Sequence, residues 1–404
     1  MSEAQTELRL WAASGAMALT GRHDGSPAAS PGRPATAVAE ALRRIQAVHP
    51  QAPLPDIRIF GERAAATGMS RNAPWSCGGA FRVLPTRDGH FGLSLPRAED
   101  MDMVPALVAG PVTGDPWTTV EHWAVGTTTA DAVERARLLD LACAPVTARP
   151  TPVVRPAALV SPLGTRALND RPLVVDLSSL WAGPLCAHLL SLCGAEVVKA
   201  EGSHRSDGAR RGPAVFYDLL HAGHRSVTVD FDAPSDLRRL RMLLASADLV
   251  IEGSRARALR RRGISAEDIV AAGTNWLSIT AYGRDEDLIG FGDDVAAGAG
   301  LVTPERFPCG DALADPLTGV TAAAYAVEAL DARETVLIDV SMHAVAAAAA
   351  QGATAPHEVV RRRGTWWVDC DSGAFAVARP SMRQPSGRAP AAGRHNHDVL
   401  WTTT

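Results

Sequence analysis

The sequence predicts an α/β fold, a doubly wound parallel sheet accompanied by a smaller α+β domain. Between Pro172 and Ser341, short apolar runs alternate with helical stretches of about ten to fifteen residues, as strands and crossover helices do in parallel sheets. Residues 75–148 instead contain two apolar runs separated by a polar turn with a glycine, which is typical of an antiparallel hairpin. The two patterns do not overlap, so we expect two separately folded parts.

The first unit of the parallel sheet is predicted between residues 173 and 200. Leu173–Leu177 is an apolar run that predicts a strand, and Gly183–Cys193 predicts a helix that ends at Gly194. Glu196–Ala200 gives a second strand and completes a strand–helix–strand unit. The loop after the first strand therefore lies at the carboxyl edge of the sheet, where ligands bind in such folds.

The same alternation continues to residue 340. Leu237, Leu240 and Leu244 recur at helical spacing, which indicates a helix that packs on the sheet. The further elements predicted here are strands at 226–231, 248–251, 276–280 and 335–340, and helices after Ser235, at 265–272 and after Pro316.

The flanking regions give weaker patterns. A helix is expected at 37–48, and the small-domain hairpin joins strands at 81–84 and 91–95. Residues 128–143 predict a capped helix that completes this domain. Four prolines between residues 149 and 170 favour a surface linker, and the segment after residue 380 is expected to be extended.

Composition and charge exclude several classes of protein. The 40 basic and 44 acidic residues give a formal net charge of −4, too close to neutral for a nucleic-acid binder that works by bulk positive charge. No run of about 18 apolar residues predicts a membrane span, and the first residues lack a basic-then-apolar signal. The six cysteines form no CxxC pair, so we expect reduced thiols in a cytoplasmic protein without a metal site.

Asp315 is the acid with the most informative surroundings, because it precedes Pro316 and an alanine-rich stretch that predicts a helix. One interpretation is structural, an aspartate N-cap with proline at the first helical position. The other is functional, since a helix N-terminus stabilises an ionised carboxylate that can act as a nucleophile. The local sequence leaves both interpretations open.

Two further loops follow strands of the predicted sheet. Ser178–Pro184 offers backbone N–H groups suited to phosphate, although it does not contain a GxGxxG fingerprint. Arg255 follows the strand at 248–251, and a solvated surface arginine is the alternative interpretation. The histidines of His221–Arg225 lack metal-ligand spacing, and the pair Asp293–Asp294 is interpreted as a solvated turn.

Several short motifs follow one another between residues 174 and 319. They are Val174–Leu177, Ala182–Pro184, Gly194–Glu201, His221–Phe231, Ile251–Ala256, Ser278–Gly283 and Ala314–Gly319. In this order they resemble the class III CoA-transferase family, also called the CaiB/BaiF family, which includes formyl-CoA transferases and α-methylacyl-CoA racemases. The resemblance implies that the parallel sheet is the Rossmann-like large domain of that family.

The flanks resemble pieces of the same family in an unusual order. Ser14–Gly21 resembles a segment that precedes the catalytic aspartate, Trp123–Val146 the small domain and His395–Leu400 the closing segment. The resemblance implies a rearranged chain. Its expected parts are a degenerate large-domain remnant (1–60), the small α+β domain (75–148), a linker (149–171), the CoA-binding catalytic domain (172–345) and a tail that packs back or is extended (346–404).

The resemblance implies a CoA-transferase that moves CoA between an acyl-CoA and a carboxylic acid, with CoA as a substrate and no other cofactor. Asp315 aligns with the family's catalytic aspartate and would form acyl-aspartyl and aspartyl-CoA intermediates. The residues expected to contact CoA are Leu180, Ala182, Gly183, Pro184, Lys199, Arg225 and Arg255. A homo-oligomer is also implied, and neither nucleic acid nor a membrane is an expected partner.

Two alternatives to a transferase stay open. Racemases of the family carry a histidine where this chain has Asp293, and a racemase needs a second acid–base group, so the replacement weighs against an acyl-CoA racemase or epimerase. The rearranged order also fits a catalytically silent CoA-binding subunit. Because Asp311 lies four residues before Asp315, we expect it outside the site, as a control of equal charge.

Overall fold

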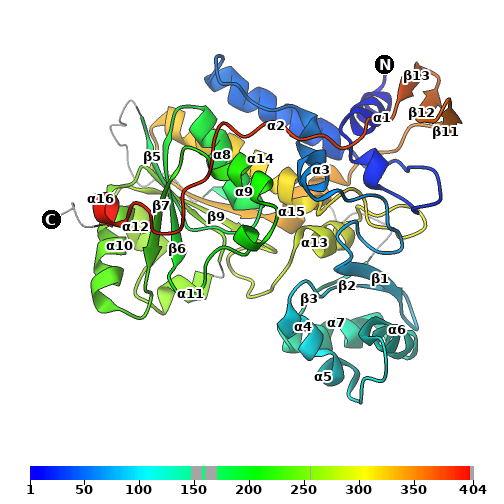
Figure 1. Ribbon diagram of the computed structural model, residues 1–404, viewed down its shortest axis with the longest axis horizontal. Helices are drawn as coiled ribbons and strands as arrows, with labels where there is room; N and C mark the ends of the chain where they lie inside the picture. Colours follow the sequence, from blue (N-terminus) through cyan, green and yellow to red (C-terminus); the bar gives the residue numbers. More distant parts are fainter. Residues whose placement is uncertain (147–156, 160–170, 255, 401–404) are drawn as a thin grey trace.

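The computed structural model describes residues 1–146, 157–159, 171–254 and 256–400 (Figure 1). Its largest sheet has seven strands in the order β4-β10-β9-β8-β5-β6-β7. From β10 to β7 all neighbouring strands run parallel, whereas β4 pairs antiparallel with β10 at the edge. The predicted parallel sheet is confirmed. Its strands are β4 (Ala157–Leu159), β5 (Leu173–Asp176), β6 (Glu196–Gly202), β7 (Arg225–Val229), β8 (Leu249–Glu252), β9 (Asn275–Thr280) and β10 (Leu337–Ser341).

Helices cover both faces of this sheet because alternate strand residues enter two different cores. Val174 and Val197 belong to one apolar cluster, and their neighbours Val175 and Val198 belong to another. The first face packs against α8 (Ala182–Leu192), α9 (Ala214–His221), α14 (Ala314–Ala332) and α15 (Met342–Ala349). The second packs against α10 (Pro234–Ser246) and α12 (Ala266–Ala271), and α11 (Ala256–Arg260) lies between them in the chain.

The N-terminal helices form a further layer on α14 rather than a separate unit (Figure 1). Trp11 and Ile45 are buried in the same apolar cluster as Leu317 and Val320 of α14. The elements of this layer are α1 (Glu3–Ala13), η1 (Met17–Leu19), α2 (Pro34–Val48), η2 (Ile57–Gly61) and α3 (Glu62–Thr67). Residues 1–67 therefore share a core with the sheet region that follows much later in the chain.

The small region that follows has its own sheet and its own core. The predicted hairpin is confirmed, since β1 (Phe81–Pro85) pairs antiparallel with β2 (His90–Ser94). The helix predicted at 128–143 is correct only in its first part. It ends at Leu138, Asp140 takes a left-handed φ of 55°, and β3 (Ala142–Pro145) then pairs with β2. The other helices are α4 (Ala98–Asp102), α5 (Val104–Val108), α6 (Pro116–Gly126) and α7 (Thr129–Leu138).

The C-terminal segment runs from the N-terminal helices to the β7 edge of the large sheet (Figure 1). It forms a three-stranded sheet of β11 (Glu358–Arg362), β12 (Thr365–Cys370) and β13 (Gly373–Ala376) before it reaches α16 (Asn396–Leu400). On the way, Arg383 forms an ion pair with Glu62 of α3, and His395 bonds to the β7 residue Ser226. Residues 157–159, inside the expected linker, form β4, and most of the rest of that linker lies outside the described residues.

Candidate active site

Asp315 lies in the first turn of α14, which begins one residue earlier at Ala314. The N-cap of this helix is Leu313, and no side chain caps it. The backbone N–H of Asp315 donates to the carbonyl of Ala312 at 2.9 Å. The interpretation of Asp315 as an N-cap is therefore wrong, because its carboxylate does not cap α14.

The start of a second helix points at the same carboxylate. The backbone N–H of Ala182, the first residue of α8, donates a hydrogen bond to Asp315, and this bond lowers the pKa of the carboxyl. Gly319 permits this approach, because a Cβ atom there would lie 2.6 Å from the carbonyl oxygen of Ala182. Two helix N-termini thus meet at Asp315, and the unpaired N–H groups at a helix start favour negative charge.

Two more aspartates and one arginine complete the cluster around Asp315. Arg63 of α3 holds Asp311 through two hydrogen bonds, 2.9 Å from Nε and 2.5 Å from Nη2. Asp293 of α13 (Gly292–Gly298) accepts a hydrogen bond of 3.0 Å from the backbone N–H of Ala312. The turn that leads into α14 is therefore held by two side chains, Arg63 of α3 and Asp293 of α13.

Burial and the neighbouring charges bring the pKa values of two carboxyl groups in this cluster close to neutral pH. Burial raises the pKa of Asp315 to about 7, the positive charge of Arg63 opposes this rise, and the negative charges of Asp293 and Asp311 add to it. Burial and the charge of Asp311 raise the pKa of Asp293 to about 6. At pH 7 the Asp315 carboxyl consequently exists in both its protonated and its ionised form.

Gly292 closes the space on the remaining side of Asp315. A Cβ atom at residue 292 would collide with Oδ2 of Asp315 and with the carbonyl oxygen of Ala312. This explains the glycine in physical terms: only a residue without a side chain allows α13 to begin against the carboxylate.

The sequence-predicted Ser178–Pro184 loop lies beside this cluster through the start of α8. Ala182, Gly183 and Pro184 are buried, and Gly183 packs so closely on the Ser178 side chain that a Cβ would collide with it. Leu180 differs, because it is 43% exposed and has a left-handed φ of 70°. Such a backbone conformation is unfavourable for a residue with a side chain and is found preferentially at functional sites.

Lys199, the single lysine of the chain, fixes the Ser178–Pro184 loop. Its ammonium is 3.3 Å from Asp176 and 3.2 Å from Asp207, and it also donates to the carbonyl of Ser178. Asp207 in turn accepts the backbone N–H of Leu180 at 2.9 Å. Lys199 is 1% exposed, so it positions the loop and does not present its charge to solvent, unlike the CoA contact expected from the sequence.

The structure does not bring Arg225 together with Asp315. Arg225 is level with Val198, whose side chain enters the α10 face of the sheet, whereas α14 covers the opposite face. Its guanidinium forms an ion pair with Glu196. It lines an open pocket of about 590 Å³ with the C-terminal residues Arg388 and Arg394. Arg255, the remaining predicted CoA contact, lies outside the described residues.

Sequence reasoning missed three of the groups around Asp315. The interpretation of Asp293 and Asp294 as a solvated turn is wrong, since both lie in α13 and Asp294 is buried, with a hydrogen bond of 2.7 Å from Ser94. Asp311 is not outside the site and cannot serve as its control. Arg63 gave no local signal, because it meets Asp311 across 248 residues of chain.

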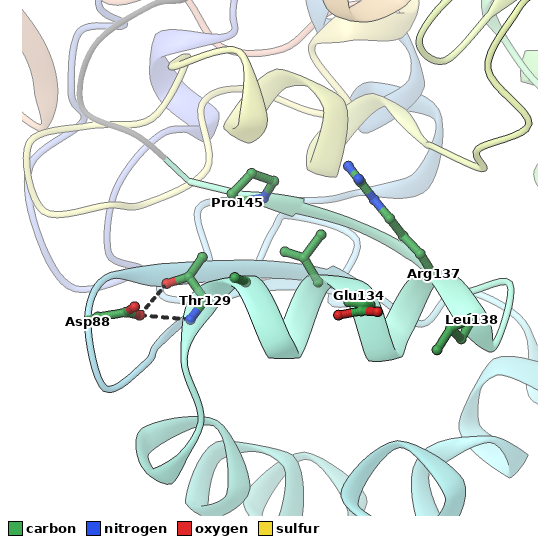
Figure 2. Close-up of a pocket in the computed structure, with 8 residues that line it drawn as sticks. Asp88, Thr129, Glu134, Arg137, Leu138 and Pro145 are labelled. Atoms are coloured by element: carbon green, nitrogen blue, oxygen red, sulfur yellow. Dashed lines mark hydrogen bonds between the residues drawn. The ribbon is translucent and has the colours of Figure 1, made fainter.

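A separate pocket of about 740 Å³ lies on the small region (Figure 2). It is lined by residues of α7 and by Asp88 and Pro145, and Asp88 accepts two hydrogen bonds from Thr129. None of its lining residues belongs to the cluster around Asp315. Among the described residues, no group of His, Cys, Asp and Glu is arranged to hold a metal, and no helix is long and apolar enough to cross a membrane.

Known CoA-transferases are similar to part of this chain. A succinyl-CoA–D-citramalate CoA-transferase of Chloroflexus aurantiacus is 29% identical over 179 residues, which cover 40% of this chain and 44% of that protein. A succinate–glutarate CoA-transferase of Agrobacterium fabrum is 28% identical over 183 residues, covering 39% and 45%. The chain thus spans less than half the length of either relative.

A crystal structure of a CaiB/BaiF family protein from Brucella suis aligns with a TM-score of 0.44 and 23% identity, covering 51% of this chain and 66% of that one. The model of CoA-transferase family III matches residues 172–365, a range that contains Asp315, Asp293, the Ser178–Pro184 loop and Lys199. Residues 172–365, which contain the six parallel strands of the large sheet, are thus similar to CoA-transferase family III over just under half of the chain.

Proposed function

We propose that this protein is an acyl-CoA:carboxylate CoA-transferase in which Asp315 is the nucleophile. The observation that carries the proposal is the place of Asp315, where the starts of α8 and α14 meet within the segment that matches the family. A carboxylate there receives a backbone N–H and keeps a fraction ionised at pH 7. Both properties suit covalent catalysis by a carboxylate.

The proposed reaction begins when a carboxylate oxygen of Asp315 attacks the thioester carbonyl of the donor. The C–S bond breaks, CoA leaves as a thiolate, and an acyl-aspartyl anhydride forms. The thiolate then attacks the aspartyl carbonyl, releasing the donor acid and leaving an aspartyl-CoA thioester. The acceptor acid repeats these two steps in reverse order, which yields the new acyl-CoA and regenerates the Asp315 carboxylate.

Residues of the described chain supply charge stabilisation and position during these steps. The N–H of Ala182, already bonded to Asp315, is a candidate donor to the oxyanion that develops on the aspartyl carbonyl. Leu180 belongs to the Ser178–Pro184 loop, where it is exposed and has a left-handed φ. It is our candidate for contact with the CoA moiety. Lys199 acts through the loop that it fixes and does not touch the substrate.

The test is CoA exchange between an acyl-CoA and a panel of acids. The panel includes succinyl-CoA with glutarate and with D-citramalate, because the two relatives carry these names. We expect exchange by the parent protein and its loss in Asp315→Asn, since an amide is a very poor nucleophile. Asp331→Asn is the matched control, because Asp331 is exposed in the last turn of the same helix.

Two other outcomes separate the alternatives. Uptake of deuterium at the α-carbon of an acyl-CoA without CoA exchange would indicate a racemase or epimerase that uses carboxyl groups. Binding of CoA with neither exchange nor deuterium uptake would indicate a silent CoA-binding subunit. Either result would overturn the proposed transferase.

A further inference from the structure

Arg63 reaches the Asp315 cluster from outside the segment that matches the family. It lies in α3, and its guanidinium bonds to Asp311 through Nε and Nη2. The guanidinium carbon also lies 5.1 Å from the ring centroid of Trp181, the residue that directly precedes the N–H donor Ala182. Arg63 thus contacts both structural parts that hold Asp315, the turn before α14 and the start of α8.

The position of Arg63 affects the electrostatic environment of the Asp315 carboxyl. Asp293 approaches from α13 and Asp311 from the turn, and both are negative when ionised. Ser76 bonds to Asp293, and the thiol of Cys77 donates to the carbonyl of Gly310 at 2.9 Å, so the loop before β1 contributes no positive charge there. Among the charges that shift the pKa of Asp315 most, which belong to described residues, Arg63 is the positive one.

The other charged groups on neighbouring elements are engaged elsewhere. Glu62, which precedes Arg63 in α3, forms an ion pair with Arg383 of the C-terminal segment. Asp294 of α13 bonds to Ser94 of β2. On α14 itself, Glu328 pairs with Arg44 of α2, several turns away from Asp315.

We propose that Arg63 is a positioning residue that the N-terminal segment supplies to the Asp315 site. It fixes the turn before α14 through Asp311 and keeps the Asp315 carboxylate available in its ionised form near neutral pH. The effect of Arg63 on catalysis rests on the proposed transferase function. The ionisation of Asp315 itself can be measured without any activity.

The direct measurement is the titration of Asp315 by NMR in protein carrying 13C at the aspartate carboxyl carbons. Its resonance is the one lost in Asp315→Asn. In the parent protein we expect a midpoint near pH 7. Arg63→Met should raise this midpoint by about one to two pH units, because a neighbouring arginine lowers an aspartate pKa by roughly that amount.

Asp311→Asn gives the opposite expectation. It removes one negative charge near Asp315 and leaves Arg63 in place, so the midpoint should fall below that of the parent. Simple damage to the fold would not shift the two variants in opposite directions. Arg63→Lys keeps the charge and should stay closer to the parent than Arg63→Met does.

Arg58→Met is the matched control for Arg63→Met. Arg58 lies five residues earlier, is 64% exposed and pairs with Asp56, so the midpoint of Asp315 should not change. Midpoints within about 0.3 pH units of the parent in both Arg63→Met and Asp311→Asn would overturn the proposal. Opposite shifts in a protein that shows no CoA exchange would support the role of Arg63 and reject the transferase instead.

Discussion

Replacing Lys199 with methionine tests how the loop beside Asp315 is built. The ammonium of Lys199 bridges Asp176 and Asp207, and all three side chains are buried. The methionine side chain is unbranched like that of lysine and one atom shorter, and it leaves the two carboxylates without their cation. Losing two buried contacts between opposite charges at about 1.5–3 kcal/mol each gives an expected loss of about 3–6 kcal/mol in the free energy of unfolding.

Urea unfolding followed by circular dichroism measures this loss. Arg260→Met is the control, since Arg260 is 56% exposed and its ion pair with Glu267 should be worth less than about 1 kcal/mol. Adding Asp207→Asn to Lys199→Met should recover part of the loss, because it removes one of the stranded charges. A loss below about 1 kcal/mol for Lys199→Met would refute the network as the support of the loop.

Two further predictions concern the site glycine and a buried histidine. Gly292→Ala should abolish CoA exchange, since its Cβ would collide with Oδ2 of Asp315, whereas Gly126→Ala should be tolerated because no atom lies within 4 Å of its Cβ. Burial, with a smaller effect of Lys199, lowers the pKa of His224 to about 4. As the pH falls below about 6.5, the unfolded chain binds a proton at His224 before the folded protein does. The free energy of unfolding therefore falls, by about 2 kcal/mol at pH 5. Unfolding free energies measured from pH 7 to 4 should fall less steeply in His224→Leu, and an unchanged slope would contradict this.

The sequence predicted the parallel sheet well because its strands are local apolar runs bounded by glycines and helices. Elements without that pattern were missed. β4 has only three residues and lies in a proline-rich segment, and β11 (Glu358–Arg362) has partly or fully exposed side chains throughout. The helix predicted at residues 128–143 ends at Leu138, because Asp140 adopts a left-handed conformation. An aspartate alone does not predict this conformation.

The site was predictable only where it depends on one continuous stretch of chain. Asp315 stands in a motif of six residues, so its neighbours in the sequence identified it. Asp293 and Arg63 reach it through the packing of α13 and α3 on the start of α14, which no local pattern encodes. Lys199 illustrates the same limit, because its motif was recognised while its burial against Asp176 and Asp207 was not.

The most direct test of the central claim is chemical trapping of the acylated enzyme. The protein is incubated with an acyl-CoA, treated with hydroxylamine or borohydride, digested and mapped by mass spectrometry. We predict one modified carboxyl group, at Asp315, that is absent from Asp315→Asn and present in Asp331→Asn. A folded protein that binds CoA and exchanges it with acids, but carries the mark on another residue or on none, would contradict the account.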